Sequence, residues 1–233
     1  MKRTLPRDWA RASLFIIFAI IVKKRTKSMI QVLQERLTFE EFLEIYPDDG
    51  GRYELIEGSV VEMRPIGPHE LMTSFIGAEF NIEIRRLGFP YTVAHNTLVK
   101  LIQIDSVDSS YLPDVIVLDR SVLAQDPYWE KHSTISEGAS ARLVVEVVST
   151  NWRDDYLTKL RDYEALGISE YWIVDYLALG AVRYIGQPKQ PTISVYELID
   201  GEYQVRQFQG NDRIVSSIFP ELNLRVSQVF EAV

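Results

Sequence analysis

The sequence predicts an α/β fold in which helices flank a mixed central sheet, with additional antiparallel strands and hairpins. The run at 143–148 is aliphatic except for one carboxylate, which is typical of a strand buried on both faces. A segment with helical periodicity follows at 153–166 and leads directly into a second apolar run at 170–175. This order of strand, helix and strand favours parallel pairing at the centre of the sheet.

Local signals predict the remaining elements. Thr38 and Glu41 form a capping box that opens a helix, and Gly88 is a typical C-terminal cap for a long one. Glu57-Gly58 joins two extended runs as a hairpin turn. In chain order we expect a helix at 38–46, hairpin strands at 52–56 and 59–63, a helix at 69–87, strands at 91–95, 97–102 and 112–118, a polar loop at 119–141, strands at 182–185, 193–198 and 203–207, and a short helix near the end.

A chain of 233 residues with 46% hydrophobic content can bury one sizeable core, and we expect a single domain over 29–233. Residues 1–28 form a basic and apolar extension that we place outside the fold. Its apolar run, 12–22, is about half of the ~20 residues that a membrane-spanning helix requires, so we expect no stable membrane insertion. The extension is either an upstream segment of a protein whose body begins near Met29 or a weak interfacial anchor.

The charge is unevenly distributed along the chain. Residues 1–28 have a net charge of +7, so the total of -8 leaves -15 on the remainder. An acidic body argues against broad, tight DNA binding, because phosphate neutralisation supplies most of such affinity. It argues less against a nuclease, whose carboxylates hold a divalent metal and whose basic contacts can be few and local.

The chain has no cysteine and three histidines, so any metal is expected to be a hard ion bound by oxygen. The absence of cysteine is also compatible with the cytoplasmic location that we expect.

Glu146 lies in the middle of an aliphatic strand, where a carboxylate is costly unless a metal ion or a fixed cation compensates for it. The alternatives are a structural ion pair, or a strand with one face open to solvent. Asp114 follows Pro113 at the start of another aliphatic strand. Two such strands side by side could bring both carboxylates to one divalent cation, although Pro-Asp alone is also common in turns.

Lys159 lies at the edge of the apolar stripe of the 153–166 helix, between Tyr156 and Tyr163. Its ammonium can reach toward the sheet, where it would orient an attacking water or neutralise charge on a phosphate. The alternative is a lysine whose stem covers apolar surface while its ammonium stays in water.

A set of motifs is distributed along the chain: Pro113-Asp114, the 145–149 segment, Asp155 with Lys159 and Tyr163, the 167–175 segment, the early 52–58 segment, and His69. Taken together, these motifs resemble the Uma-type putative restriction endonuclease family, a branch of the PD-(D/E)XK nuclease superfamily that is abundant in cyanobacteria. The resemblance extends over roughly residues 37–224.

The resemblance implies a restriction-endonuclease-like sheet core in which Asp114 and Glu146 bind Mg²⁺, with Mn²⁺ able to substitute, and a lysine assists phosphodiester hydrolysis. The superfamily expects that lysine two positions after the glutamate, where this chain has Val148. The resemblance therefore assigns the role to Lys159 on the next helix. It also suggests Glu54 as an outer acidic ligand and His69 as a proton carrier, although a surface histidine at a helix start is ordinary.

Two functions follow. The first is a Mg²⁺-dependent endonuclease that hydrolyses DNA, expected as a homodimer because two sites related by a twofold axis can cut both strands. The second is a catalytically inactive module with a nuclease fold that binds nucleic acid or a protein partner, which the acidic body and Val148 favour. A glycosidase built on paired carboxylates has no supporting motif.

Overall fold

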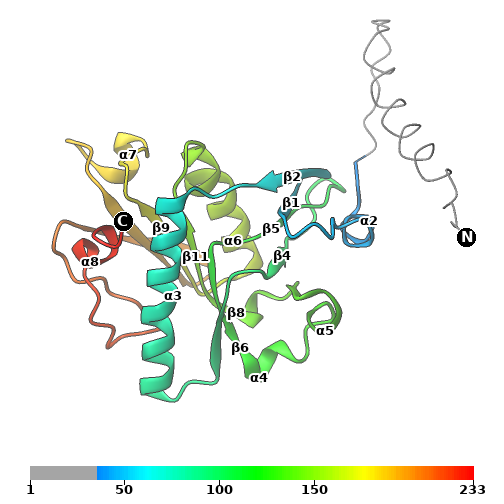
Figure 1. The fold of residues 1–233 in the computed structure, drawn as a ribbon, viewed down its shortest axis with the longest axis horizontal. Coiled ribbons are helices and arrows are strands. Elements are labelled where there is room, and N and C mark those ends of the chain that lie inside the picture. The colour runs from blue at the N-terminus through cyan, green and yellow to red at the C-terminus, as the bar shows by residue number, and fades with distance from the viewer. Residues whose placement is uncertain (1–35) are drawn as a thin grey trace, which may run out of the picture. The chain divides into compact units, whose positions relative to one another are not determined.

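Two β-sheets with helices around them make up residues 36–233, which are the residues that this computed structural model describes (Figure 1). The predicted extension at 1–28 lies outside them. None of the helices in residues 36–233 combines the length and the hydrophobicity that a membrane span requires.

The larger sheet has six strands, in the order β11-β10-β9-β8-β6-β3. They are β3 (Tyr91–Ala94), β6 (Val115–Asp119), β8 (Ala141–Val147), β9 (Glu170–Asp175), β10 (Thr192–Ile199) and β11 (Glu202–Gln209). The smaller sheet has five strands, in the order β2-β1-β5-β4-β7. They are β1 (Arg52–Ile56), β2 (Ser59–Met63), β4 (Leu98–Lys100), β5 (Ser110–Tyr111) and β7 (Thr134–Ile135).

The helices lie between and around the strands. The α-helices are α2 (Phe39–Glu44), α3 (Gly67–Leu87), α4 (Arg120–Leu123), α5 (Trp129–His132), α6 (Leu160–Leu166), α7 (Val182–Ile185) and α8 (Val226–Phe230). A 3-10 helix, η1 (Gly138–Ser140), precedes β8, and a π-helical segment, η2 (Asp154–Lys159), leads into α6.

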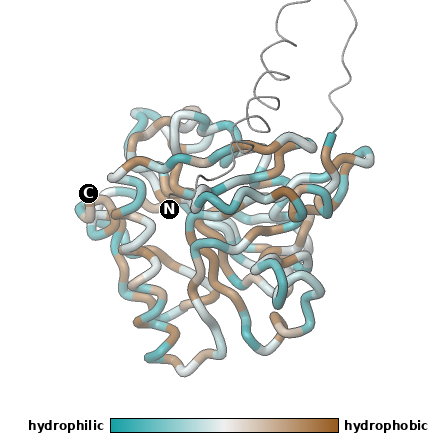
Figure 2. Tube along the Cα trace, turned by 45° about the vertical axis from the view of Figure 1, so that its right-hand side comes forward, coloured by the Kyte–Doolittle hydropathy of each residue, from teal (hydrophilic) through white to brown (hydrophobic). Residues whose placement is uncertain are grey.

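The centre of the larger sheet is buried on both faces. β8 and β9 pair in parallel, as the strand, helix, strand order predicts, and β6 pairs with β8 antiparallel. Alternate side chains of these strands pack with α3 on one face and with η2 and α6 on the other. Figure 2 shows hydrophobic and hydrophilic segments alternating along α3, as expected for a helix with one buried side. The α/β class with a mixed sheet is confirmed.

Several local predictions are also confirmed. Thr38 and Glu41 form the capping box of α2, and β1 and β2 form the hairpin. Glu57 and Gly58 both have positive φ at its turn, which suits a tight two-residue connection. Gly88 caps α3 in the left-handed conformation, and the helix begins at Gly67, two residues before its predicted start.

Three predictions differ from the structure. The 182–185 segment, predicted as a strand, is the short helix α7. Val182 is exposed and Ile185 is buried, and the Tyr184 N–H donates to the Ala181 carbonyl, so local turn bonding outweighs the β-like composition. The polar loop at 119–141 contains α4, α5, β7 and η1. The predicted α-helix at 153–166 is π-helical in its first part.

Candidate active site

Asp114 and Glu146 are brought together by the register of two neighbouring strands. β6 and β8 pair with Val115 opposite Val145, and continuing this register by one residue places Asp114 opposite Glu146. Residues opposite each other in an antiparallel pair have Cβ atoms roughly 5 Å apart on the same face. The Val147 N–H donates to Asp114 Oδ2 at 2.7 Å and orients this carboxylate. Both carboxylates therefore face one side of the sheet near the end of β8.

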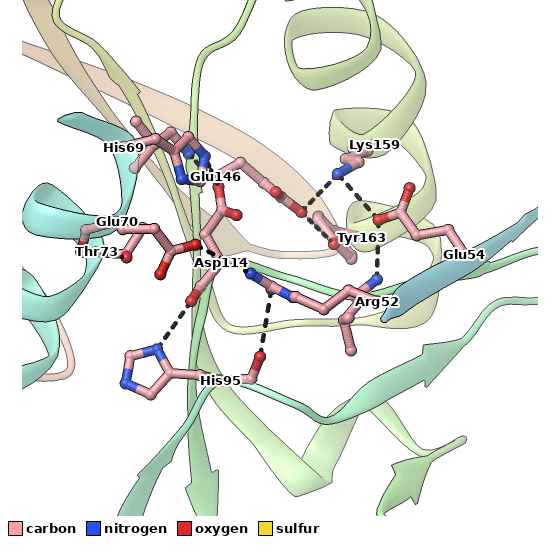
Figure 3. A network of polar contacts seen from close by, with 12 residues as sticks. Arg52, Glu54, His69, Glu70, Thr73, His95, Asp114, Glu146, Lys159 and Tyr163 are labelled. Carbon is pink, nitrogen blue, oxygen red and sulfur yellow. Dashed lines mark hydrogen bonds and ion pairs between the residues drawn. The ribbon is translucent and has the colours of Figure 1, made fainter. Parts of the chain in front are cut away.

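These carboxylates line a cavity of about 340 Å³ together with other ionisable side chains. Figure 3 shows the elements that supply them: β8 carries Glu146, α3 carries His69, and the helix after β8 carries Lys159. Asp155, Arg52 and Arg64 also line this cavity. The site thus combines several charges of both signs in a small volume, as the sequence predicts for Asp114, Glu146 and Lys159.

Lys159 is buried at the last residue of η2, where its ammonium contacts two carboxylates. Its Nζ lies 3.1 Å from Glu146 Oε1 and 3.5 Å from Glu54 Oε1. Burial opposes the charge on Lys159, yet Glu146, Glu54 and Asp155 hold the pKa of the ammonium well above its usual value. The alternative of a lysine with its ammonium in water does not describe this residue, whose side chain is 8% exposed.

Glu146 is 3% exposed and has two close partners. The Tyr163 hydroxyl donates to its Oε1 at 2.7 Å, and Lys159 contacts the same oxygen. Burial raises the pKa of Glu146 to about 7; Lys159 opposes this rise, while the neighbouring charges of Asp114 and Glu54 add to it. A second cation near Glu146 would lower the electrostatic cost of this arrangement.

His69 lies in the first turn of α3 and is buried against Asp114. Its Nε2 is 3.0 Å from Asp114 Oδ2. Burial lowers the pKa of the imidazole, but the hydrogen bond and the charge of Asp114 outweigh that effect and raise it. Within the described residues, the His69 Nδ1 has no hydrogen-bond partner. His69 is thus a buried residue that lines the cavity and contacts Asp114, not a surface histidine.

Glu54 lies on β1, on the opposite side of the Lys159 ammonium from Glu146 (Figure 3). Its Oε1 accepts a hydrogen bond from the Leu112 N–H at 2.9 Å and contacts Lys159. It does not belong to the residues that line the cavity. This geometry suits a residue that positions Lys159 and the segment before Asp114, and the role of Glu54 as an outer metal ligand stays a prediction.

The structure adds functional candidates that sequence reasoning did not assign. Asp155 is buried in η2 and lines the cavity, and burial raises the pKa of its carboxyl well above the usual value. Asp155 is one of the residues that carry the family resemblance, but in the sequence it follows Asp154 near a helix start, where acidic residues are ordinary. Its spacing of four from Lys159 is the one local signal of a role. Tyr163 was assigned to the apolar stripe, a pattern that does not show where a hydroxyl points.

Two further residues hold the backbone of this region in place. His95 Nδ1 lies 3.0 Å from the Asp114 carbonyl, and Arg52 donates to the His95 carbonyl at 3.3 Å. Arg52 also lies 3.8 Å from Glu70 on α3. Nothing local in the sequence indicates these contacts, because they join four separate elements.

The donor set suits a hard divalent ion. Asp114 and Glu146 each engage one oxygen in the contacts above, and no hydrogen bond within residues 36–233 engages Asp114 Oδ1 or Glu146 Oε2. The same residues contain no group of three histidine, aspartate or glutamate side chains arranged to hold a metal. Mg²⁺ needs fewer protein ligands than that, because it usually retains several waters and binds through one or two carboxylates. The two carboxylates therefore fit Mg²⁺, with water filling the other positions.

The sequence and the fold are both similar to those of known proteins. The model of the Uma2 family, described as putative restriction endonuclease, matches residues 39–227. The fold is similar to the crystal structure of a putative nuclease belonging to DUF820 from Anabaena variabilis ATCC 29413, with a TM-score of 0.60 and 19% sequence identity. The similarity covers 84% of this chain and 98% of the other chain. At 19% identity, it shows that the two proteins share a fold. No curated protein matches the chain.

Proposed function

The chain belongs to the Uma2 family of putative restriction endonucleases, and from this premise we propose that it is a metal-dependent endonuclease that hydrolyses the phosphodiester bonds of DNA. The observation that carries the proposal is the convergence of Asp114, Glu146 and Lys159 on one cavity. Two carboxylates without full compensation and one fixed ammonium match the needs of phosphoryl chemistry, in which positioning and charge stabilisation do most of the work.

Asp114 and Glu146 are the residues that would hold Mg²⁺, with Mn²⁺ able to substitute. When bound, such an ion supplies an activated water and offsets charge on the phosphate. Lys159 places its ammonium beside Glu146, where it orients the attacking water and neutralises developing negative charge. Tyr163 keeps Glu146 in position through its hydroxyl, and Glu54 does the same for Lys159.

His69 and Asp155 supply proton chemistry in this proposal. His69 holds a proton at Nε2, 3.0 Å from Asp114, and can release or accept it at the cavity. Asp155 presents a carboxyl with a raised pKa to the same cavity, where it can hydrogen-bond a water. Both roles depend on the same buried geometry as the carboxylate pair.

The second candidate is a module that binds DNA or a protein without cutting. Val148 supports it, because the position of the superfamily lysine is here 1% exposed and packed in the core. The proposed endonuclease requires Lys159 to replace that lysine from the helix. The two candidates differ in one measurable property, which is turnover.

Plasmid cleavage tests the proposal. Wild type should convert supercoiled plasmid to nicked and linear forms with Mg²⁺ or Mn²⁺, and Glu146→Gln should lose at least about a thousandfold in rate, because the change removes a metal-binding charge. Glu202→Gln, the same chemical change at an exposed residue of β11, is the matched control. Absence of cutting by wild type, or equal cutting by Glu146→Gln, would contradict the endonuclease and leave the binding module.

We also propose that the cutting species is a homodimer, since two sites related by a twofold axis suit the cleavage of both strands. Sedimentation equilibrium that gives a monomer mass under cutting conditions would contradict this point.

A further inference from the structure

Two arginines lie over aromatic rings beside the cavity. The guanidinium carbon of Arg153 is 4.7 Å from the ring centroid of Trp152, and that of Arg183 is 4.6 Å from the ring centroid of Tyr184. Both arginines are exposed, and both rings are half-buried. We refer to these four residues as the arginine–aromatic surface.

This surface borders the site along the chain and through ring contacts. Thr150 and Asp155 both line the cavity, and Trp152 and Arg153 lie between them in the sequence. The rings of Trp152 and Tyr184 have centroids 6.2 Å apart, which brings α7 against the start of η2. In Figure 1, α7 lies at the same end of the molecule as the first turn of α3. The surface is therefore adjacent, along the chain and through ring contacts, to residues that line the cavity.

Tyr156 packs against both aromatic residues of this surface and holds them in place. Its ring is buried, stacks on Tyr184 with centroids 4.9 Å apart, and contacts Trp152 at 6.2 Å. The two rings that lie under the arginines, those of Trp152 and Tyr184, are thus packed against the core between η2 and α7.

The arginines of this surface have no acidic partner in the part of the chain that the structure describes. Within residues 36–233, neither Arg153 nor Arg183 forms an ion pair with an acidic side chain. The adjacent Asp154 accepts a hydrogen bond from Asn151 instead. Ring contacts of this kind hold the arginines in place without cancelling their charge. Outside residues 1–28 the chain has a net charge of -15, so these two arginines place positive charge on an otherwise acidic body.

We propose that the arginine–aromatic surface binds the phosphates of the nucleic-acid strand next to the bond that is cut. The proposal rests on the proposed function, since it assigns the path of that substrate. A guanidinium has a planar set of donors that matches phosphate geometry, and aromatic residues interleaved with arginine are typical of surfaces that follow a nucleic-acid backbone. An acidic protein partner would need the same charge but would not require a position beside the cavity.

Equilibrium binding of a fluorescein-labelled DNA duplex, followed by anisotropy in the presence of a chelator, tests this surface without cleavage. The double variant Arg153→Gln/Arg183→Gln should bind roughly tenfold more weakly, and the slope of log affinity against log salt should become shallower by about 1.8, the value for two lost phosphate contacts. Arg153→Lys/Arg183→Lys should recover most of the slope, because it keeps the charge.

The matched control is Arg85→Gln/Arg120→Gln, which removes the same charge from two exposed arginines. Arg85 follows His69 by 16 residues along α3, which is about 24 Å at 1.5 Å per residue. This control should keep the wild-type affinity and slope. Equal weakening in both double variants would show a general charge effect and overturn the proposal, as would an unchanged slope in Arg153→Gln/Arg183→Gln.

The same variants separate this inference from the proposed function. Wild type that binds DNA through the two arginines but never cuts plasmid contradicts the endonuclease and supports the surface. Wild type that cuts, with Arg153→Gln/Arg183→Gln binding DNA as wild type does, contradicts the surface alone. If Arg153→Gln/Arg183→Gln lost affinity for polyglutamate but kept full affinity for DNA, the proposal would be overturned in favour of an acidic protein partner.

Discussion

Glu146 and Glu170 are buried carboxylates on the parallel strands β8 and β9, and their surroundings are opposite in kind. Glu170, which is 0% exposed, accepts hydrogen bonds at 2.6 Å from the Trp172 indole, the Ser216 hydroxyl and the Ser217 N–H. Glu146, which is 3% exposed, has Tyr163 and Lys159 as its close partners and has other carboxylates near it.

The two positions also occupy opposite ends of the strand pair. Glu170 begins β9, whereas Glu146 lies one residue before the end of β8, at the edge of the sheet where ligands of α/β proteins usually bind. Burial of a carboxylate therefore does not indicate function by itself. Glu170 has several hydrogen-bond donors and holds the 216–218 loop in place. Glu146 is incompletely compensated and lies beside a cavity, as the proposed metal site requires.

The largest difference between the two sites should be in stability. Glu170→Gln should lower the free energy of unfolding by about 1–3 kcal/mol, because an amide cannot accept all the bonds that the carboxylate accepts. Glu146→Gln should leave the metal-free protein as stable as wild type or more stable. The change removes a buried charge, and the carboxylates of Glu54 and Asp155 still compensate the ammonium of Lys159. Urea unfolding with a chelator measures both.

A loss of stability in Glu146→Gln equal to that in Glu170→Gln would remove the contrast and make Glu146 a structural residue. Plasmid cleavage by folded Glu170→Gln should meanwhile stay close to the wild-type rate, because Glu170 does not line the cavity.

A smaller effect is expected from Tyr163→Phe, which removes the hydroxyl that donates to Glu146 Oε1. Cutting should slow by up to about tenfold, consistent with the loss of one hydrogen bond of roughly 1 kcal/mol. Tyr196→Phe is the control, because the Tyr196 ring stacks on Tyr171 and no hydrogen bond among residues 36–233 joins the Tyr196 hydroxyl to Glu146. The role of Tyr163 would be rejected if both variants cut at the same rate.

The smallest effect should come from a carboxylate at the surface. Glu40 accepts bonds from the Lys100 ammonium at 2.8 Å and the Tyr128 hydroxyl at 2.7 Å, and these contacts lower the pKa of Glu40 to about 2. A lowered pKa stabilises the fold above the ordinary value of 4.5, and this contribution disappears as pH falls toward 2. Because the Glu40 side chain is 56% exposed, Glu40→Gln should cost less than about 1 kcal/mol at neutral pH.

Thermal unfolding of wild type and Glu40→Gln between pH 2 and pH 7 checks this sign. The two proteins should converge at low pH; a difference that grows as pH falls would contradict it.

The sequence alone determined the elements whose signals are local. The buried strands at the sheet centre, the long helix that ends at Gly88 and the Glu57-Gly58 hairpin depend on periodicity and turn chemistry within a few residues. The cost of a carboxylate in an aliphatic strand is also local, and it singled out Glu146 as a residue that requires a partner.

Only the packing of distant segments determines which charged side chains contact one another. The register of β6 and β8 joins Asp114 to Glu146 across 32 positions, and β1 brings Glu54 to Lys159 across 105. The burial of Asp155 and the donors around Glu170 likewise come from segments that meet only in the fold. Strand register and helix packing depend on the summed contacts of distant residues, whereas periodicity reports only which face of each element is buried.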